Sequence, residues 1–136
     1  MPAFVTHKQI RFQHCDPAGI VFYPEYFLLA NEVVEDWFQD GLGVDFRKMH
    51  LDDHIGIPVR KTACEFFATS MIGDRLDWSL TVSRVGGSSV AMTIRASSGG
   101  EQRAVFEHLI VYASMKTRKA IPLPEDLRAR MLGFKE

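Results

Sequence analysis

One long apolar helix, preceded by a single strand and followed by several, is the feature that most constrains the fold. Residues 25–39 carry apolar side chains at helical spacing over so wide an arc that most of the helix surface must be buried. The apolar positions are Tyr26, Phe27, Leu29, Ala30, Val33, Val34, Trp37 and Phe38. Pro24 suits the first helical position, where no N–H is needed, and Gly41 and Gly43 can end the helix.

Strand-like runs occur once before this helix and four times after it. The clearest run places Leu76 and Trp78 on one face and polar residues on the other, and a turn at 86–88 joins it to a matching run. The predicted strands are residues 3–13, 58–69, 76–83, 90–96 and 103–114. A short helix within 44–54 and a terminal helix at 123–132 complete the expected elements.

A buried helix followed by an antiparallel meander of four strands can be covered only if it lies across the apolar face of the sheet. The sequence therefore predicts an α+β fold in which a five-stranded antiparallel sheet wraps around one long central helix. No linker or repeat divides the chain, so residues 1–136 are expected to form a single domain. The open edges of such a sheet predict pairing with a second subunit.

Composition argues against several classes of function. The net charge of -1 gives no general attraction for nucleic acid. Cys15 and Cys64 lack the spacing of a zinc site, and the five histidines are dispersed; His50 and His54 would share a helix face without a third ligand. No apolar run resembles a signal peptide or membrane span, so a cytoplasmic protein without membrane contact is expected.

The segment from His14 to Pro24 brings a carboxylate, a glycine-bearing turn and a helix start close together. The first amides of a helix have no helical partner and carry partial positive charge, so they can stabilise an oxyanion that forms near Asp16. An aspartate before a proline is also a common turn former, so Asp16 has a purely structural alternative. His14 and Cys15 are expected to pack or to lie in the loop.

The run Asp-Pro-Ala-Gly-Ile-Val-Phe-Tyr-Pro-Glu-Tyr at 16–26 resembles the signature of the 4-hydroxybenzoyl-CoA thioesterase family of hot-dog enzymes. The resemblance implies hydrolysis of an acyl-CoA thioester without a metal or other cofactor, coenzyme A being part of the substrate. It also implies a homodimer that pairs into a homotetramer, with the active site at the subunit interface.

Matched position by position, Asp16 corresponds to the catalytic aspartate and Tyr23 to the residue whose backbone N–H polarises the thioester carbonyl. Gly19 and Phe22 are expected to contact the substrate. An ordinary aspartate pKa of about 3.9 lies roughly three units below the optimum for a base at neutral pH, a handicap of about 4 kcal/mol. This favours Asp16 as a nucleophile, while a general-base role stays open.

The resemblance weakens at the substrate-recognition positions. Where 4-hydroxybenzoyl-CoA enzymes carry an acidic residue that meets the substrate hydroxyl, this chain has Asn31, which can still form a hydrogen bond or can be a plain surface residue. Arg84, Arg118 and Lys119 are candidates for the coenzyme A phosphates, with simple surface charges as the alternative.

The acyl group is therefore predicted to be aromatic or short-chain. An aliphatic acyl-CoA thioesterase is the alternative within the same reaction class. Two further alternatives are a hot-dog hydratase, which would need a second acid–base group, and an acyl-CoA binding protein, which would have no need for Asp16.

Overall fold

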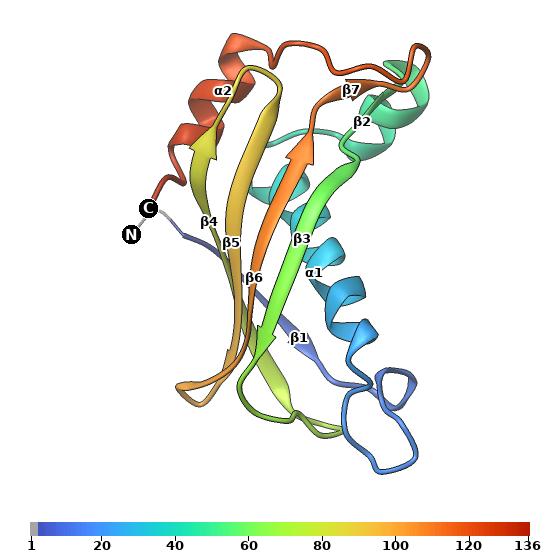
Figure 1. The fold of residues 1–136 in the computed structure, drawn as a ribbon, viewed down its shortest axis with the longest axis vertical. Helices are drawn as coiled ribbons and strands as arrows, with labels where there is room; N and C mark the ends of the chain where they lie inside the picture. Colours follow the sequence, from blue (N-terminus) through green and yellow to red (C-terminus); the bar gives the residue numbers. More distant parts are fainter. Residues whose placement is uncertain (1–2) are drawn as a thin grey trace.

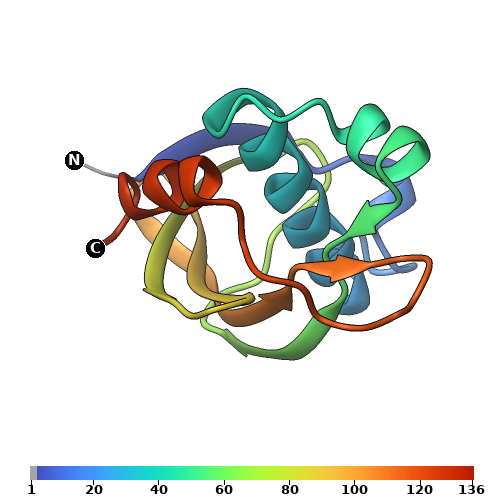
Figure 2. The ribbon, with the colours of Figure 1, turned by 90° about the horizontal axis from the view of Figure 1, so that it is seen from above.

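The computed structural model describes residues 3–136 and confirms the predicted α+β architecture. A five-stranded antiparallel sheet curves around helix α1 (Pro24–Asp36), as Figures 1 and 2 show from two directions. The strands are β1 (Phe4–Gln9), β3 (Val59–Phe66), β4 (Arg75–Val85), β5 (Ser89–Ser98) and β6 (Glu101–Val111). Strands β2 (Ile55–Gly56) and β7 (Ala113–Ser114) form a separate small sheet, and α2 (Glu125–Leu132) lies near the C-terminus.

Helix α1 begins and ends where the sequence predicts. Pro24 occupies the start of the helix, and Glu25 places a carboxylate in its positively polarised first turn. The helix continues through a widened turn at Trp37–Gly41, in which the Leu42 N–H donates to the Trp37 carbonyl at 2.8 Å. Gly43 follows with φ 68°, a conformation that favours glycine, so the chain leaves the helix there.

The core lies between α1 and the concave face of the sheet. Alternate residues of β4, β5 and β6 face the helix and are buried: Leu76, Trp78, Leu80, Val82, Val90, Met92, Ile94, Ala96, Ala104, Phe106 and Ile110. Phe106 joins the two layers, because its ring packs edge-on against Phe27 of α1 at a centroid distance of 5.1 Å. The predicted inward faces of the 76–83 and 90–96 runs are thereby confirmed.

The predicted four-strand meander is wrong in one respect. Only β4, β5 and β6 are sequential neighbours; β3 crosses the end of the sheet and pairs with β6, which gives the order β1-β4-β5-β6-β3. Alternation of apolar residues shows which face of a strand is buried but carries no information about its neighbours, so the sequence could not place β3 at an edge.

Several element bounds also differ from the predicted ones. The first strand ends at Gln9, and Phe12–His14 forms a 3₁₀ turn in place of its predicted end. The predicted strand 103–114 is interrupted after Val111, so that its last residues join β2. The short helix predicted within 44–54 is present at Lys48–Asp52, and the terminal helix begins after Pro124. Over residues 3–136, no helix has the length and apolar character that crossing a membrane requires.

Candidate active site

The loop between β1 and α1 is a tight, hydrogen-bonded hairpin. The Asp16 N–H donates to the Ile20 carbonyl at 2.9 Å, and the Phe22 N–H donates to the His14 carbonyl at 3.0 Å. Its outer side is tied to the segment between β3 and β4, since the Val21 N–H donates to the Ser70 carbonyl at 2.9 Å. These hydrogen bonds therefore fix the position of Asp16 relative to the start of α1.

The Asp16 carboxylate is half-buried and partly engaged in its own loop. Its Oδ1 accepts the Ala18 N–H at 2.9 Å, the local turn that aspartate commonly forms. Among residues 3–136, Oδ2 has no hydrogen-bonding partner. Asp16 thus has the turn-forming role that the sequence also allowed. Its Oδ2 is not used in this turn and is available for contact with a substrate.

Gly19 gives the hairpin its shape. Its φ of 80° lies in the left-handed region, and a Cβ built there would meet nothing within 4 Å. Any cost of a side chain at this position would therefore come from the backbone conformation and not from crowding.

Replacing Gly19 by alanine should lower the free energy of unfolding by about 1–2 kcal/mol, because alanine disfavours this φ. Gly87→Ala is the matched control: Gly87 also has open space around its Cβ position, without a positive φ. Chemical denaturation of both variants checks this. Equal stabilities of the two variants would contradict the expected strain at Gly19.

The N-terminus of α1 leaves one amide free. The Glu25 N–H donates to the Phe22 carbonyl at 2.8 Å and the Tyr26 N–H to the Tyr23 carbonyl at 3.1 Å, while Pro24 has no N–H. Within the described chain, the Tyr23 N–H has no such acceptor. The sequence predicted several free amides at this helix end; the structure leaves the amide of Tyr23, the same residue singled out by the resemblance.

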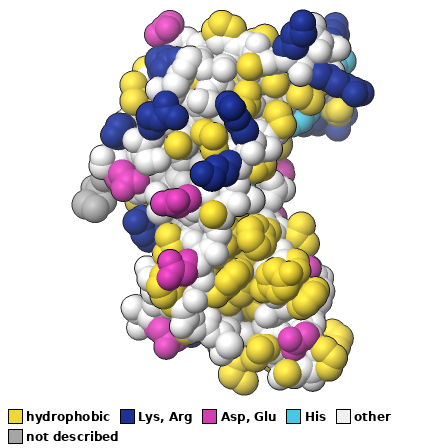
Figure 3. All heavy atoms as spheres, in the orientation of Figure 1, with side chains coloured by type: hydrophobic (Ala, Val, Ile, Leu, Met, Phe, Trp, Pro, Cys, Tyr) yellow, Lys and Arg dark blue, Asp and Glu magenta, His cyan; other side chains and the backbone are white. Residues whose placement is uncertain are grey.

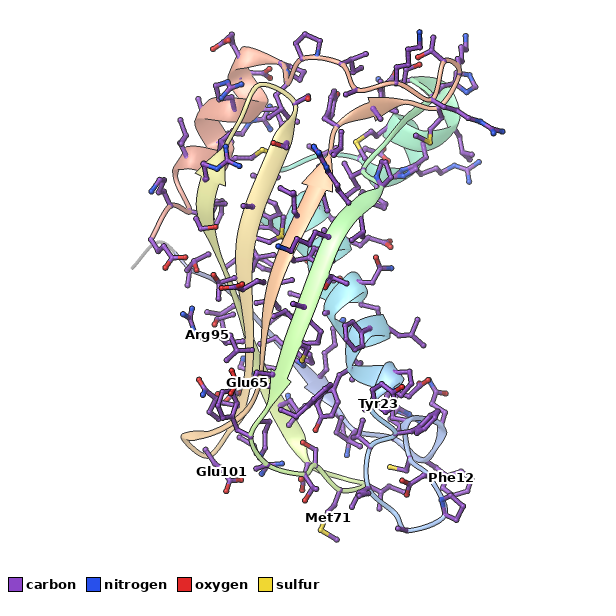
Figure 4. All side chains as sticks on the ribbon, in the orientation of Figure 1. Phe12, Tyr23, Glu65, Met71, Arg95 and Glu101 are labelled. Carbon is purple, nitrogen blue, oxygen red and sulfur yellow. The ribbon has the colours of Figure 1, made fainter. Side chains whose placement is uncertain are left out.

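An aromatic cavity of about 320 Å³ opens beside this helix end. We call it the aromatic cavity; it is lined by Val21, Tyr23, Tyr26 and residues 66–69. Phe66 packs against Tyr26 at a ring-centroid distance of 5.5 Å and against Tyr23 at 6.2 Å. Tyr23 lies at the start of α1 with Phe12 and Met71 at the same end of the molecule (Figure 4). Phe22 is half-exposed and packs edge-on against Tyr23 at 5.6 Å.

Sequence reasoning missed the network that supports this end of the helix. The Tyr26 hydroxyl donates to Ser70 Oγ at 2.8 Å, and Ser70 is fully buried. The Arg103 guanidinium also donates to Ser70 Oγ, at 3.0 Å, and to Asp74 Oδ2 at 2.9 Å. The Met71 N–H and the Arg103 guanidinium hold the pKa of Asp74 below its ordinary value. These residues are scattered along the chain, so no local pattern could have identified them.

Asn31 lies farther along α1 and lines a second cavity of about 310 Å³, which we call the central cavity. This cavity lies between α1, the end of β6 and the segments 46–50 and 56–59. Asn31 is therefore exposed to a concave site, with Glu35 beside it on the same wall.

The three candidate phosphate contacts do not come together within one subunit. Arg84 lines a hollow on the outer face of the sheet, with Arg95 and Glu107. Arg118 and Lys119 lie in the exposed loop between β7 and α2, which Figures 1 and 2 place away from the end of β4. Arg118 has φ 61°, and its N–H donates to the Ser114 carbonyl at 2.8 Å, so this loop is ordered by its own backbone.

The remaining candidates for metal or thiol chemistry are not assembled. Over residues 3–136, no three His, Cys, Asp or Glu side chains cluster as metal ligands would. His54 lies beyond the helical turn that contains His50, so the two do not share a helix face. Burial raises the pKa of Cys64 to about 11, which makes its thiol a poor nucleophile at neutral pH.

Residues 10–131 match the thioesterase-like superfamily. A 1,4-dihydroxy-2-naphthoyl-CoA hydrolase from Thermosynechococcus vestitus is 24% identical over 123 residues, 90% of this chain and 84% of that protein. A gentisyl-coenzyme A thioesterase of known structure has a TM-score of 0.84 and 26% identity over 92% of this chain and 99% of that chain. A thioesterase-superfamily protein from Jannaschia sp. CCS1 has a TM-score of 0.90 at 22% identity, covering 98% of this chain and 94% of that chain.

The predicted relationship is thus confirmed at the level of the superfamily and the fold. Two of these relatives are named for aryl-CoA thioesters other than 4-hydroxybenzoyl-CoA, so the narrower 4-hydroxybenzoyl-CoA assignment is not supported by them. The match covers nearly the whole chain, and the sheet wrapped around α1 is the expected architecture. The chain therefore belongs to the thioesterase-like superfamily and has a hot-dog fold.

Proposed function

We propose that this protein hydrolyses an aryl-CoA thioester to the free acid and coenzyme A, with Asp16 and the Tyr23 amide at the reacting centre. The observation that carries the proposal is the free Tyr23 N–H on the hairpin that also holds Asp16. The adjacent aromatic cavity favours a flat acyl group over an alkyl chain. Relatives named for dihydroxynaphthoyl-CoA and gentisyl-CoA also support an aromatic substrate.

In the proposed reaction, Asp16 attacks the thioester carbonyl carbon and the C–S bond breaks. Coenzyme A leaves as a thiolate, which takes a proton from solvent, and a mixed anhydride remains on Asp16. Water then attacks the anhydride, releasing the free acid and restoring the carboxylate. The Tyr23 N–H stabilises the oxyanion that forms in each addition step.

The exposed apolar surface favours a homodimer. Large apolar side chains gather at the α1 N-terminal end and on the neighbouring end of β3, and Figure 3 shows this hydrophobic area on one face. They include Phe12, Phe22, Tyr23, Phe66, Phe67, Met71 and Ile72. Strand β3 is also a free sheet edge. A patch of this kind next to an open edge marks an interaction surface.

Two-fold pairing of the β3 edges would make one continuous sheet with both helices on the same side. The paired strands run antiparallel, so the Phe66 end of β3 lies beside the partner's Val59. A two-fold axis at Ala63 would place Lys61 opposite the partner's Glu65, and both side chains belong to the outer face of the sheet. The same pairing would bring Arg118 and Lys119 of one subunit towards the active site of the other, which keeps them as candidates for contact with the coenzyme A phosphates.

Reversing one charge of this pair should weaken the dimer. Lys61→Glu would place two like-charged pairs across the axis and raise the dissociation constant about 10-fold or more, whereas Lys61→Glu/Glu65→Lys should restore it. Sedimentation equilibrium measures both constants. A double variant as weak as the single one would contradict this register. The same measurement on the wild-type protein gives the mass of its assembly, which shows whether two dimers pair into the predicted tetramer.

The proposed function is tested by release of the coenzyme A thiol from a panel of aryl- and alkyl-CoA thioesters. The expected result is higher kcat/KM for aryl substrates. Higher values for alkyl substrates would instead support the aliphatic enzyme. If the protein binds these thioesters but hydrolyses none of them, the acyl-CoA binding alternative is supported. If a substrate is consumed without thiol release, a hydratase is supported.

A further inference from the structure

His108 is a buried polar side chain for which the proposed mechanism has no use. It follows Phe106 on the helix-facing side of β6 and is only 7% exposed. Its Nδ1 lies 3.0 Å from Thr62 Oγ1 of β3. Over residues 3–136, its Nε2 is buried and has no hydrogen-bonding partner. An unpaired nitrogen in a protein interior is costly and calls for an explanation.

His108 is one of the residues that line the central cavity, and it also borders the hollow that contains Arg84. The wall of the central cavity is largely apolar, with Val34, Ile57 and Ile110 among its residues. Asn31 and Glu35 add polar groups from α1. A concave, mostly apolar site with a few polar groups is the usual form of a small-molecule pocket.

The state of the imidazole suits a neutral, hydroxyl-bearing ligand. Burial lowers the pKa of His108 below its ordinary value, so the ring is neutral at pH 7. The Thr62 hydroxyl can either donate to Nδ1 or accept from it. Nε2 is accordingly a donor in one arrangement and an acceptor in the other. A phenolic hydroxyl, which both donates and accepts, is compatible with either arrangement.

The central cavity is too far along α1 to serve the reacting centre of its own subunit. With a rise of 1.5 Å per residue, Asn31 lies about 12 Å along the helix from Tyr23, beyond the reach of an aryl ring attached to the thioester carbon. The β3 pairing described above brings the Val59 side of this cavity to the partner's Phe66, next to the partner's Tyr23. One acyl group can then span the two subunits.

We propose that His108 recognises a hydroxyl group on the aromatic acyl moiety, with its Nε2 as the hydrogen-bonding atom, in the active site whose Asp16 belongs to the partner subunit. The protein is thereby a thioesterase selective for hydroxyaryl-CoA over unsubstituted aryl-CoA. This inference rests on the proposed function and adds a specificity-determining residue to it.

The test compares kcat/KM for benzoyl-CoA with that for 2-, 3- and 4-hydroxybenzoyl-CoA. The wild-type protein should prefer at least one hydroxylated substrate over benzoyl-CoA by roughly 10- to 100-fold. Benzoyl-CoA has no hydroxyl group, so His108 Nε2 stays unpaired when it binds. His108→Leu should abolish this preference, so that kcat/KM for the hydroxylated substrates falls to the level of that for benzoyl-CoA in the same variant. His108→Gln places an amide nitrogen near the Nε2 position and should restore part of the preference.

A change in folding alone would move all substrates together, so the preference ratio isolates recognition. A wild-type protein that hydrolyses benzoyl-CoA and all three hydroxybenzoyl-CoAs equally well would overturn this inference and leave the thioesterase proposal intact. The same holds if His108→Leu keeps the preference. A wild-type protein that hydrolyses none of these substrates or any other thioester would overturn both.

A mixed dimer tests the placement across subunits. One chain carries Asp16→Asn and the other His108→Leu, with two different affinity tags for purification. If the site is shared, one site per dimer combines the intact Asp16 of one chain with the intact His108 of the other, and the hydroxyl preference is retained. Activity with the preference of the His108→Leu variant would show that the two residues act within one subunit and would overturn the placement.

Discussion

Replacing Asp16 by asparagine is expected to lower kcat for thioester hydrolysis by about 10²- to 10⁴-fold, the range associated with loss of an acid–base or comparable reacting group. The physical reason is that an amide is neither a nucleophile nor a base at neutral pH. The loop should survive, because the asparagine Oδ1 can still accept the Ala18 N–H that now binds Asp16 at 2.9 Å. Thiol release under saturating substrate measures the change.

Asp45→Asn is the matched control. Asp45 is exposed, and its Oδ1 accepts the Lys48 N–H at 3.0 Å, so the variant makes the same chemical change at a local backbone contact outside the proposed site. Its kcat should stay close to that of the wild-type protein. If Asp16→Asn retained full activity with an unchanged fold, Asp16 would have no part in the reaction. Mass spectrometry of rapidly quenched enzyme distinguishes the two roles, because only a nucleophile forms an acyl adduct on Asp16.

Replacing Tyr23 by proline is expected to lower kcat by about 10²- to 10³-fold, the cost of losing one oxyanion-stabilising donor. Proline removes the N–H itself, which a side-chain change cannot do. The local conformation accepts it, since Tyr23 has φ -52°, close to the fixed value of proline. The amide also donates no backbone hydrogen bond within residues 3–136 that would be lost.

Tyr23→Ala separates the amide from the ring. It removes the 60% exposed side chain but keeps the N–H, so its kcat should exceed that of Tyr23→Pro by most of the predicted factor. Tyr23→Phe should be nearly unchanged, because the phenol has no role in the proposed chemistry. Circular dichroism checks that both variants are folded. If the folded proline and alanine variants have equal kcat values, the Tyr23 amide has no part in the mechanism.

The sequence was sufficient to predict the elements that depend on local pattern. The wide apolar arc of 25–39, with Pro24 before it and Gly41 and Gly43 after it, predicted helix α1 closely, because helix periodicity and end signals are contained in neighbouring residues. Strict alternation likewise predicted the inward faces of β4 and β5. The motif at 16–26 predicted where the candidate site begins, and the comparisons support the reaction class it implied.

What the sequence by itself determined is therefore the class of fold, the long buried helix and the position of the Asp16 hairpin. Only the tertiary structure decided that β3 lies at the edge beside β6, that Ser70 and Arg103 support the helix start, and that His108 borders a cavity and has a buried Nε2 without a partner in residues 3–136. The physical reason is the range of the interactions. Periodicity and capping act over a few residues, whereas strand order, buried hydrogen bonds and cavity walls join segments that are distant in the chain.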